Sequence, residues 1–268
     1  YDCLGRLQGQ LEKQGEGFHV RGDLATSFIA WVFAMKAVKP VEESYIKQKQ
    51  FIADASHELK TPIAVIGANI DVLKNEIPDN KWVNYIETEN IRMSALVKDL
   101  LYLAKNDVGR DKLQMLPFDF VECVNVAALP FESVAFEQGK LFELEMPKTP
   151  IPILADEAKI KQTVIVLIDN ALKNTDRGGR IKVTVSSEGK QNVVKVFNSG
   201  HGIAPEDMNK IFDRFYRADT SRDRNTGGYG LGLSIAQTIA KAHGGKITVY
   251  SRVDEYAEFV LSLPKKIN

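Results

Sequence analysis

The sequence lacks three features that would place it in a specialised class of protein. Its 268 residues include two cysteines, Cys3 and Cys123, which exclude a disulfide scaffold for a chain of this length. Basic and acidic residues balance at 35 each, so we expect no nucleic-acid partner, although a local basic patch is not excluded. There is also no internal repeat or low-complexity tract. With 44% hydrophobic and 26% charged residues, the composition is that of a folded chain of one or two domains.

The one candidate membrane segment, at residues 24–38, is short for a spanning helix. Its sequence, LATSFIAWVFAMKAV, has 15 residues, whereas a spanning helix needs about 20. The aliphatic stem of Lys36 can extend the apolar length of this segment. Two interpretations remain open: the end of a transmembrane helix, or an amphipathic or buried helix. Lys36 and Lys39 at its far end favour a cytoplasmic location for the rest. Because the first residue is tyrosine, we expect a fragment with further segments upstream.

Two apolar stripes at helical spacing follow, separated by a turn. In the first, Tyr45, Ile52, Leu59, Ile66 and Leu73 recur every seven residues, as in a coiled coil. The sequence Ile77-Pro78-Asp79-Asn80 then ends the pattern with turn residues. The second stripe contains Trp82, Ile86, Met93, Leu96, Leu100 and Leu103. Two antiparallel helices cannot bury both stripes alone, so we expect two copies to pair in a four-helix bundle, as a homodimer.

His57 lies opposite the first stripe, which argues against a core histidine. Glu58 follows it and can hydrogen-bond one ring nitrogen, which raises the nucleophilicity of the other. Thr61 shares the face of His57, and Pro62 is expected to bend the helix just beyond it. A solvated surface histidine is the alternative, and these neighbours favour a functional one.

From about residue 112 onward the pattern changes to short strands alternating with helices. We expect strands at Leu141–Met146, Ile151–Leu154, Arg180–Ser186, Val193–Phe197, Lys246–Ser251 and Phe259–Leu263. We expect helices at Phe120–Gln138, Asp156–Asn174, Pro205–Ile211 and Leu231–His243. This order is typical of an α+β sandwich of two layers.

Three clusters in this half suit a nucleoside triphosphate. QTVIVLIDNALKNT, at residues 162–175, places Asn170, Lys173 and Asn174 on one helix face. An amide oxygen there can ligate magnesium, and the lysine can neutralise phosphate. In VFNSGHGI, at 196–203, two glycines permit close backbone approach and Asn198 can face a planar base. GGYGLGL, at 227–233, exposes amides at a helix start to phosphate oxygens. Each cluster alone is weak, because polar helix faces and glycine turns are common.

Phe51 to Pro62, FIADASHELKTP, closely resembles the phosphoacceptor box of bacterial sensor histidine kinases. The histidine, acid, threonine and proline all fall at the spacing of that family. The resemblance implies that His57 is autophosphorylated and that Glu58 accepts a proton. It further implies that Thr61 positions water when the enzyme dephosphorylates its partner.

The later clusters, in this order, resemble the boxes of the ATP-binding domain of the same family, whose fold is shared with Hsp90, gyrase and MutL. The resemblance covers residues 41–264 and implies ATP and Mg²⁺ as cofactors, with Asn170 on the metal and Lys173 and Arg217 on phosphates. The segment between the second and third clusters then reads as a mobile lid. The implied nucleotide site comprises Asn170, Lys173, Asn198, Gly200, Gly202, Ile203, Tyr216, Arg217, Gly228, Tyr229, Gly230, Leu231, Gly232 and Leu233.

Two positions depart from the family pattern. Val166 stands where an asparagine usually begins the first box, and Asn198 stands where an aspartate usually accepts a hydrogen bond from the adenine amino group. Both departures predict weaker nucleotide or metal binding. An amide flip would also let the NH₂ of Asn198 face the carbonyl of guanine, so we expect weaker discrimination of adenine from guanine.

The expected fold is an all-α helical hairpin forming a dimeric four-helix bundle, followed by an α+β two-layer sandwich that binds ATP. We divide the chain into an N-terminal stub (1–40), a phosphotransfer hairpin (41–108), a linker (109–117) and a catalytic domain (118–268).

The expected function is a sensor histidine kinase at the cell membrane, with its kinase domains on the cytoplasmic side. It would phosphorylate His57, pass the phosphoryl group to an aspartate of a response regulator receiver domain, and also dephosphorylate that regulator. The alternatives are a degenerate kinase acting as a phosphatase or scaffold, and an ATPase of the same nucleotide fold without histidine chemistry.

Overall fold

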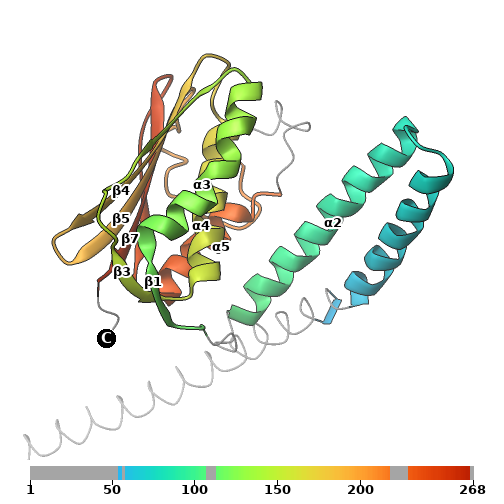
Figure 1. Ribbon diagram of the computed structural model, residues 1–268, viewed down its shortest axis with the longest axis horizontal. Coiled ribbons are helices and arrows are strands. Elements are labelled where there is room, and N and C mark those ends of the chain that lie inside the picture. The colour runs from blue at the N-terminus through green and yellow to red at the C-terminus, as the bar shows by residue number, and fades with distance from the viewer. Residues whose placement is uncertain (1–53, 56–57, 107–112, 218–228, 266–268) are drawn as a thin grey trace, which may run out of the picture. The chain divides into compact units, whose positions relative to one another are not determined.

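The computed structural model describes residues 54–55, 58–106, 113–217 and 229–265. A first helix covers residues 58–76. The further elements are α2 (Lys81–Asn106), β1 (Leu116–Asp119), α3 (Phe120–Glu137), β2 (Leu141–Glu145), β3 (Pro152–Ala155), α4 (Glu157–Lys173), β4 (Arg180–Glu188), β5 (Gln191–Ser199), α5 (Gly232–Ala242), β6 (Lys246–Arg252) and β7 (Tyr256–Pro264) (Figure 1).

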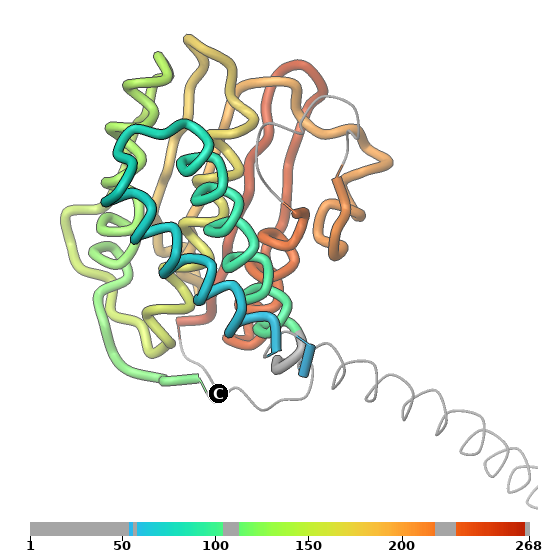
Figure 2. Tube along the Cα trace, turned by 90° about the vertical axis from the view of Figure 1, so that its right-hand side faces the viewer, coloured from blue at the N-terminus to red at the C-terminus, as the bar shows by residue number. Residues whose placement is uncertain are grey.

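The first helix and α2 form an antiparallel hairpin, drawn in blue and blue-green in Figure 2. The turn between them has Asp79 in the left-handed region, and the side chain of Asn80 caps α2 by accepting a hydrogen bond from Trp82 N at 2.9 Å. Across the hairpin, Lys74 Nζ lies 2.8 Å from Glu87 Oε1. The expected turn is therefore present at the expected place.

The row that closes this hairpin is not the apolar stripe that the sequence analysis assigned to the four-helix bundle. Its buried residues are Ile63 and Ile70 on the first helix and Val83, Asn90 and Val97 on α2. The predicted stripe is exposed in the single chain, with Leu59, Ile66 and Leu73 at 49%, 41% and 41% exposure. A repeat of seven places several rows along one helix, and the partner helix decides which row is buried. The predicted row is thus left uncovered by its own hairpin.

The second half is an α+β sandwich, as predicted. Its five-stranded sheet has the order β2-β4-β5-β7-β6, in which only β2 and β4 pair in parallel, and β1 pairs with β3 in a separate antiparallel ribbon. The helices α3, α4 and α5 cover one face of the larger sheet (Figure 1). The core lies between these two layers, where Ile160, Leu167 and Ile168 of α4 and Phe259 and Leu261 of β7 are fully buried.

Two element predictions were wrong. The strand β1 was not expected, because Pro117 interrupts it and it pairs only with the short β3. The expected helix at Pro205–Ile211 is a series of turns, with Lys210 N and Ile211 N both donating to Asp207 O at 2.8 and 2.9 Å. Seven residues that begin with proline are too few for a helix without strong packing on one face.

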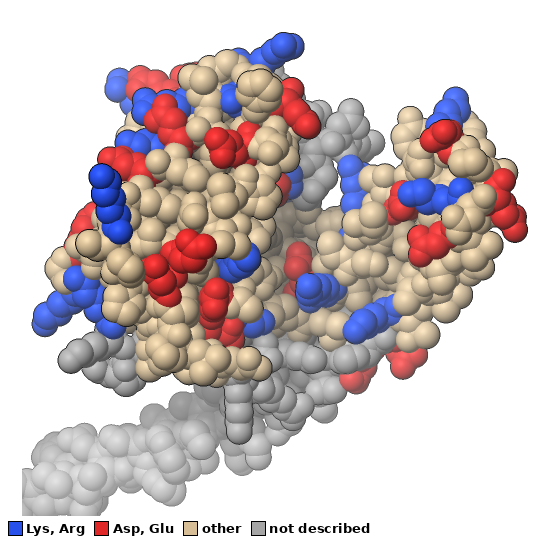
Figure 3. Space-filling view, viewed as in Figure 1, with Lys and Arg blue, Asp and Glu red and all other residues tan. Residues whose placement is uncertain are grey.

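The surface shows no single-signed charge patch on the face in Figure 3, where basic and acidic side chains of the described residues are interspersed. Within the described ranges, no helix is both long and apolar enough to cross a bilayer. The candidate membrane segment at 24–38 lies outside the described residues.

Candidate functional site

The helix α4 ends in the first predicted cluster. Asp156 caps its start by accepting a hydrogen bond from Lys159 N at 3.2 Å, and the apolar row of the helix faces the sheet. Asn170 therefore lies half-buried near the C-terminal end, and Lys173 lies exposed one turn on. Lys173 Nζ forms an ion pair with Asp169 Oδ2 at 2.6 Å. Such an exposed pair is weak, so the lysine can exchange it for a phosphate.

Three asparagines connect α4 to the end of β5. Asn174, the C-cap of α4, donates from Nδ2 to Asn170 O at 2.7 Å and to Asn170 Oδ1 at 3.2 Å. The main-chain oxygen of Asn174 accepts a hydrogen bond from Asn198 Nδ2 at 3.4 Å. Two residues that the sequence assigned to opposite ends of a nucleotide, Asn170 and Asn198, are thus linked through one residue.

Asn198 has the unsatisfied polar atom of this region. The side chain is 1% exposed, its Nδ2 donates to Asn174 O and to Ser199 O at 3.3 Å, and its Oδ1 has no partner among the described residues. A buried acceptor without a donor is costly, which favours a ligand that supplies an N–H. The amide flip that we expected is disfavoured, because it would place Oδ1 against two carbonyl oxygens.

The glycines after β5 are required by close backbone contacts. Gly200 has φ 147°, and a Cβ there would lie 2.3 Å from Asn174 O. Gly202 has φ 65°, and a Cβ there would lie 2.2 Å from the main-chain oxygen of Arg252, the last residue of β6. Next to it, Ile203 N donates to Ser251 Oγ at 2.8 Å. The segment is therefore held against both α4 and the end of β6.

The segment at 205–217 packs through its aromatic residues. The Phe212 ring meets Phe259 edge to face, with centroids 6.4 Å apart. The Tyr216 hydroxyl donates to the Asp207 carboxylate, and this hydrogen bond, with a smaller contribution from burial, raises the pKa of Tyr216 to about 12. Arg217 is exposed at the end of the segment. The residues from 218 to 228, which include the charged part of the predicted lid and Gly228, lie outside the described residues.

The third predicted cluster leads into α5. Tyr229 is 43% exposed and Leu231 is 2% exposed. At Gly230, with φ 70°, a Cβ would lie 2.7 Å from Tyr216 O. The N-cap residue Leu231 makes no side-chain capping bond, so the first amides of α5 are not satisfied by their own cap. This helix start can donate hydrogen bonds to an anion.

Val166, which stands where the family usually has an asparagine, packs against Gly232 of α5. A Cβ at Gly232 would lie 3.2 Å from Val166 Cγ1, so the valine packs where α4 meets the start of α5. Leu233, the next residue of α5, packs half-buried against the core. Val166 therefore has a packing role and offers no oxygen to a metal.

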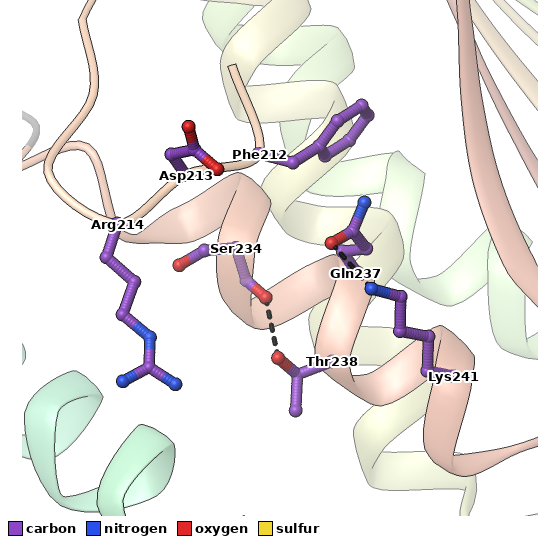
Figure 4. Close-up of a pocket in the computed structure, with 7 residues that line it drawn as sticks. All are labelled: Phe212, Asp213, Arg214, Ser234, Gln237, Thr238 and Lys241. Atoms are coloured by element: carbon purple, nitrogen blue, oxygen red, sulfur yellow. Dashed lines mark hydrogen bonds between the residues drawn. The ribbon is translucent and has the colours of Figure 1, made fainter. Parts of the chain in front are cut away.

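An open pocket of about 360 Å³ lies alongside α5 (Figure 4). It is lined by Phe212, Asp213, Arg214, Ser234, Gln237, Thr238 and Lys241. None of the described predicted site residues lines it. Thr238 Oγ1 donates to Ser234 O at 2.8 Å and Lys241 Nζ donates to Gln237 Oε1 at 3.1 Å, so these lining groups already have partners.

A magnesium ion fits the donor set only if phosphates supply most of its ligands. Among the described residues, no cluster of three histidine, cysteine, aspartate or glutamate side chains could hold a metal. Asn170 Oδ1 is the available oxygen, and it accepts one hydrogen bond from Asn174. Magnesium is commonly held by one or two protein oxygens together with phosphate and water, so the residues fit this mode.

On the hairpin, the predicted phosphoacceptor His57 lies outside the described residues. Glu58 and Thr61 are both exposed on the first helix. The site residues that the sequence did not reveal are Asn174 as a link and Asp207 as the partner of Tyr216. Asn174 was visible as a polar neighbour of Asn170, but a contact between residues 174 and 198 leaves no local pattern.

Comparison with known proteins adds independent findings. Residues 47–109 match the family model "His Kinase A (phospho-acceptor) domain", and residues 155–267 match "Histidine kinase-, DNA gyrase B-, and HSP90-like ATPase". Sensor protein DltS of Streptococcus agalactiae is 34% identical over 218 residues, which cover 81% of this chain and 55% of that protein. The chain spans about half the length of the curated relatives it matches.

Two solved structures are similar over most of the chain. Full-length ShkA in complex with AMPPNP matches with a TM-score of 0.71 at 26% identity, covering 82% of this chain and 46% of that one. Histidine kinase ThkA in complex with the response regulator protein TrrA matches with a TM-score of 0.56 at 28% identity, covering 81% and 61%. With a phosphoacceptor hairpin and an ATPase-type sandwich matched in this order, the chain belongs to the sensor histidine kinases of two-component systems.

Proposed function

We propose that the chain uses ATP to phosphorylate His57 and passes the phosphoryl group to an aspartate of a response regulator. The observation that carries this proposal is Asn198, whose buried Oδ1 has no partner among the described residues and suits the amino group of adenine. The AMPPNP in the ShkA structure and the response regulator in the ThkA structure support nucleotide binding and this partner.

The proposed nucleotide site extends from the end of β5 to the start of α5. The base would be enclosed by Asn198, Gly200, Gly202 and Ile203. Tyr216 would also contact the nucleotide. The remaining proposed residues are Asn170, Lys173, Arg217, Gly228, Tyr229, Gly230, Leu231, Gly232 and Leu233. Among these, Lys173 and Arg217 provide positive charge, and the uncapped amides of α5 provide donors for phosphate oxygens.

The proposed chemistry is an in-line phosphoryl transfer. A ring nitrogen of His57 forms a bond to the γ-phosphorus while the bond to the β–γ bridging oxygen breaks and ADP leaves. Glu58 takes the proton that the imidazole gives up, because its carboxylate follows directly in the chain. When bound, magnesium supplies charge neutralisation on the phosphates, with Asn170 Oδ1 as its protein ligand.

The decisive experiment is incubation of the whole chain with γ-labelled ATP and magnesium. We expect one label on His57 that acid removes and alkali does not. In His57→Ala the label should be absent while ATP affinity is unchanged, because the nucleotide residues belong to the sandwich and His57 to the hairpin. An acid-stable label, or labelling of His57→Ala, would contradict the proposal.

A phosphatase activity toward the regulator is the finer part of the proposal. Thr61 is exposed on the first helix. It follows His57 by four residues, a spacing that helical periodicity would place on one face, where its hydroxyl could orient a water molecule toward a phosphoaspartate. We expect Thr61→Ala to lose phosphatase activity and to keep autophosphorylation. Equal loss of both activities would show that Thr61 stabilises the helix and does not orient the attacking water.

The proposed organisation is a homodimer at the cell membrane. The uncovered row of Leu59, Ile66 and Leu73 supports pairing of two hairpins in a four-helix bundle. We keep the division into a stub (1–40), a hairpin (41–108), a linker (109–117) and a catalytic domain (118–268). The apolar run at 24–38 and the lysines after it support a membrane anchor with the kinase domains on the cytoplasmic side.

A further inference from the structure

Asn174 contacts both ends of the proposed nucleotide site with different groups. Its side-chain amide donates to the main-chain oxygen and to Oδ1 of Asn170, at 2.7 and 3.2 Å. Its main-chain oxygen accepts from Asn198 Nδ2 at 3.4 Å and adjoins Gly200. A substitution of its side chain removes only the first set of contacts, so the two ends can be tested separately.

The contact with Oδ1 decides how the Asn170 amide is oriented. Oxygen and nitrogen of an asparagine side chain exchange places on rotation, and only the oxygen can ligate a cation. A rotated Asn170 would place its NH₂ against the NH₂ of Asn174, so the observed hydrogen bond favours one orientation. Asn174 is exposed and Asn170 is half-buried, so this contact lies at the solvent boundary of the helix end.

We propose that Asn174 is a positioning residue for magnesium, which holds Oδ1 of Asn170 in the orientation that ligates the ion on a bound triphosphate. This inference rests on the proposed function, because it assumes that Asn170 is the protein ligand. A carbonyl oxygen has two lone pairs, so Oδ1 can accept from Asn174 with one and bind the cation with the other. Partners of this kind commonly change metal affinity by about 10–100-fold.

The test is the ATP affinity of the whole chain by titration calorimetry, with magnesium and with EDTA. We expect Asn174→Ala to reduce the magnesium-dependent gain in ATP affinity by about tenfold and to leave the affinity in EDTA unchanged. Asn174→Gln keeps an NH₂ donor and should restore part of the gain. The matched control is Gln138→Ala, which removes an exposed amide at the C-cap of α3 and should change neither affinity.

Asn170→Ala separates this inference from the function on which it rests. Loss of the magnesium effect in both Asn170→Ala and Asn174→Ala supports the inference. Loss in Asn170→Ala alone overturns the role of Asn174 and leaves the proposed function standing. A full magnesium effect in Asn170→Ala overturns the metal assignment and the inference with it. An equal loss with magnesium and with EDTA in Asn174→Ala shows a merely structural role and also overturns it.

Discussion

At the residue scale, the orientation of Asn198 predicts the choice of base. Because Nδ2 donates to two carbonyl oxygens, Oδ1 is presented as an acceptor, which pairs with the amino group of adenine and opposes the carbonyl of guanine. We therefore expect a preference for ATP over GTP of about tenfold, equivalent to one hydrogen bond. The measurement is the affinity for both nucleotides under the same magnesium and salt; equal affinities would show that Asn198 does not read the base.

The same contacts predict the effect of restoring the usual acid. In Asn198→Asp a carboxylate oxygen would face the carbonyl oxygens of Asn174 and Ser199, with no donor between them. We expect this variant to lower the free energy of unfolding by about 1–3 kcal/mol. Denaturant unfolding of both proteins measures the difference, and an Asn198→Asp variant as stable as the native chain would contradict the observed orientation.

Tyr216 and Asp207 give a prediction at alkaline pH. The hydrogen bond to Asp207 raises the pKa of Tyr216 to about 12, above the ordinary value of about 10. Because the pKa is raised in the folded state, the hydrogen bond of Tyr216 stabilises the folded state fully below about pH 10. This stabilisation is lost as the pH rises through about 12. The ultraviolet titration curve of the native chain, less that of Tyr216→Phe, isolates the Tyr216 phenol. In Asp207→Asn we expect the pKa of this phenol to be lower. No change in Asp207→Asn would exclude the carboxylate as the cause.

At the element scale, two glycines with positive φ separate backbone strain from steric collision. Gly189, in the β4–β5 turn with φ 55°, has open space where a Cβ would lie, whereas a Cβ at Gly200 would meet Asn174 O at 2.3 Å. We expect Gly189→Ala to cost about 1 kcal/mol of unfolding free energy. Gly200→Ala should cost about 3 kcal/mol or more, because the end of α4 must also move. Denaturant unfolding compares them, and similar costs would show that the contact with α4 is soft.

The elements also show which parts of the fold the sequence can reveal. The helix α4 was predicted at Asp156–Asn174, and the features that form it, the capping residue Asp156 and the buried row from Ile160 to Leu167, are local in sequence. The row inside the hairpin was not predicted, because a repeat of seven fits Leu59 and Ile63 equally well until the partner helix is placed. Among the proposed nucleotide-site residues, the asparagines and glycines were predicted from their residue types. The link through Asn174 was missed, since it joins residues that are 24 positions apart.

At the scale of the whole molecule, the exposed row on the first helix predicts the oligomeric state. Ile66 is 41% exposed in the single chain, and an aspartate there would place a charge within the proposed interface between hairpins. We expect Ile66→Asp to be monomeric at micromolar concentration by light scattering, with ATP affinity unchanged. The control is Ala68→Asp, which places the same charge at an exposed position off this row. A native chain that is already monomeric, or dissociation of both variants alike, would contradict the interface.

The face of the sheet that the helices leave uncovered has a consequence for association kinetics. Three ion pairs on it join neighbouring strands: Arg180 with Glu143 at 2.6 Å, Lys182 with Glu145 at 2.5 Å and Lys195 with Glu188 at 3.1 Å. At physiological ionic strength the field of a charge is screened within about 8 Å, and adjacent opposite charges cancel over a similar distance. These pairs therefore provide no electrostatic steering, and a partner approaching this face would meet it at a rate that salt hardly changes.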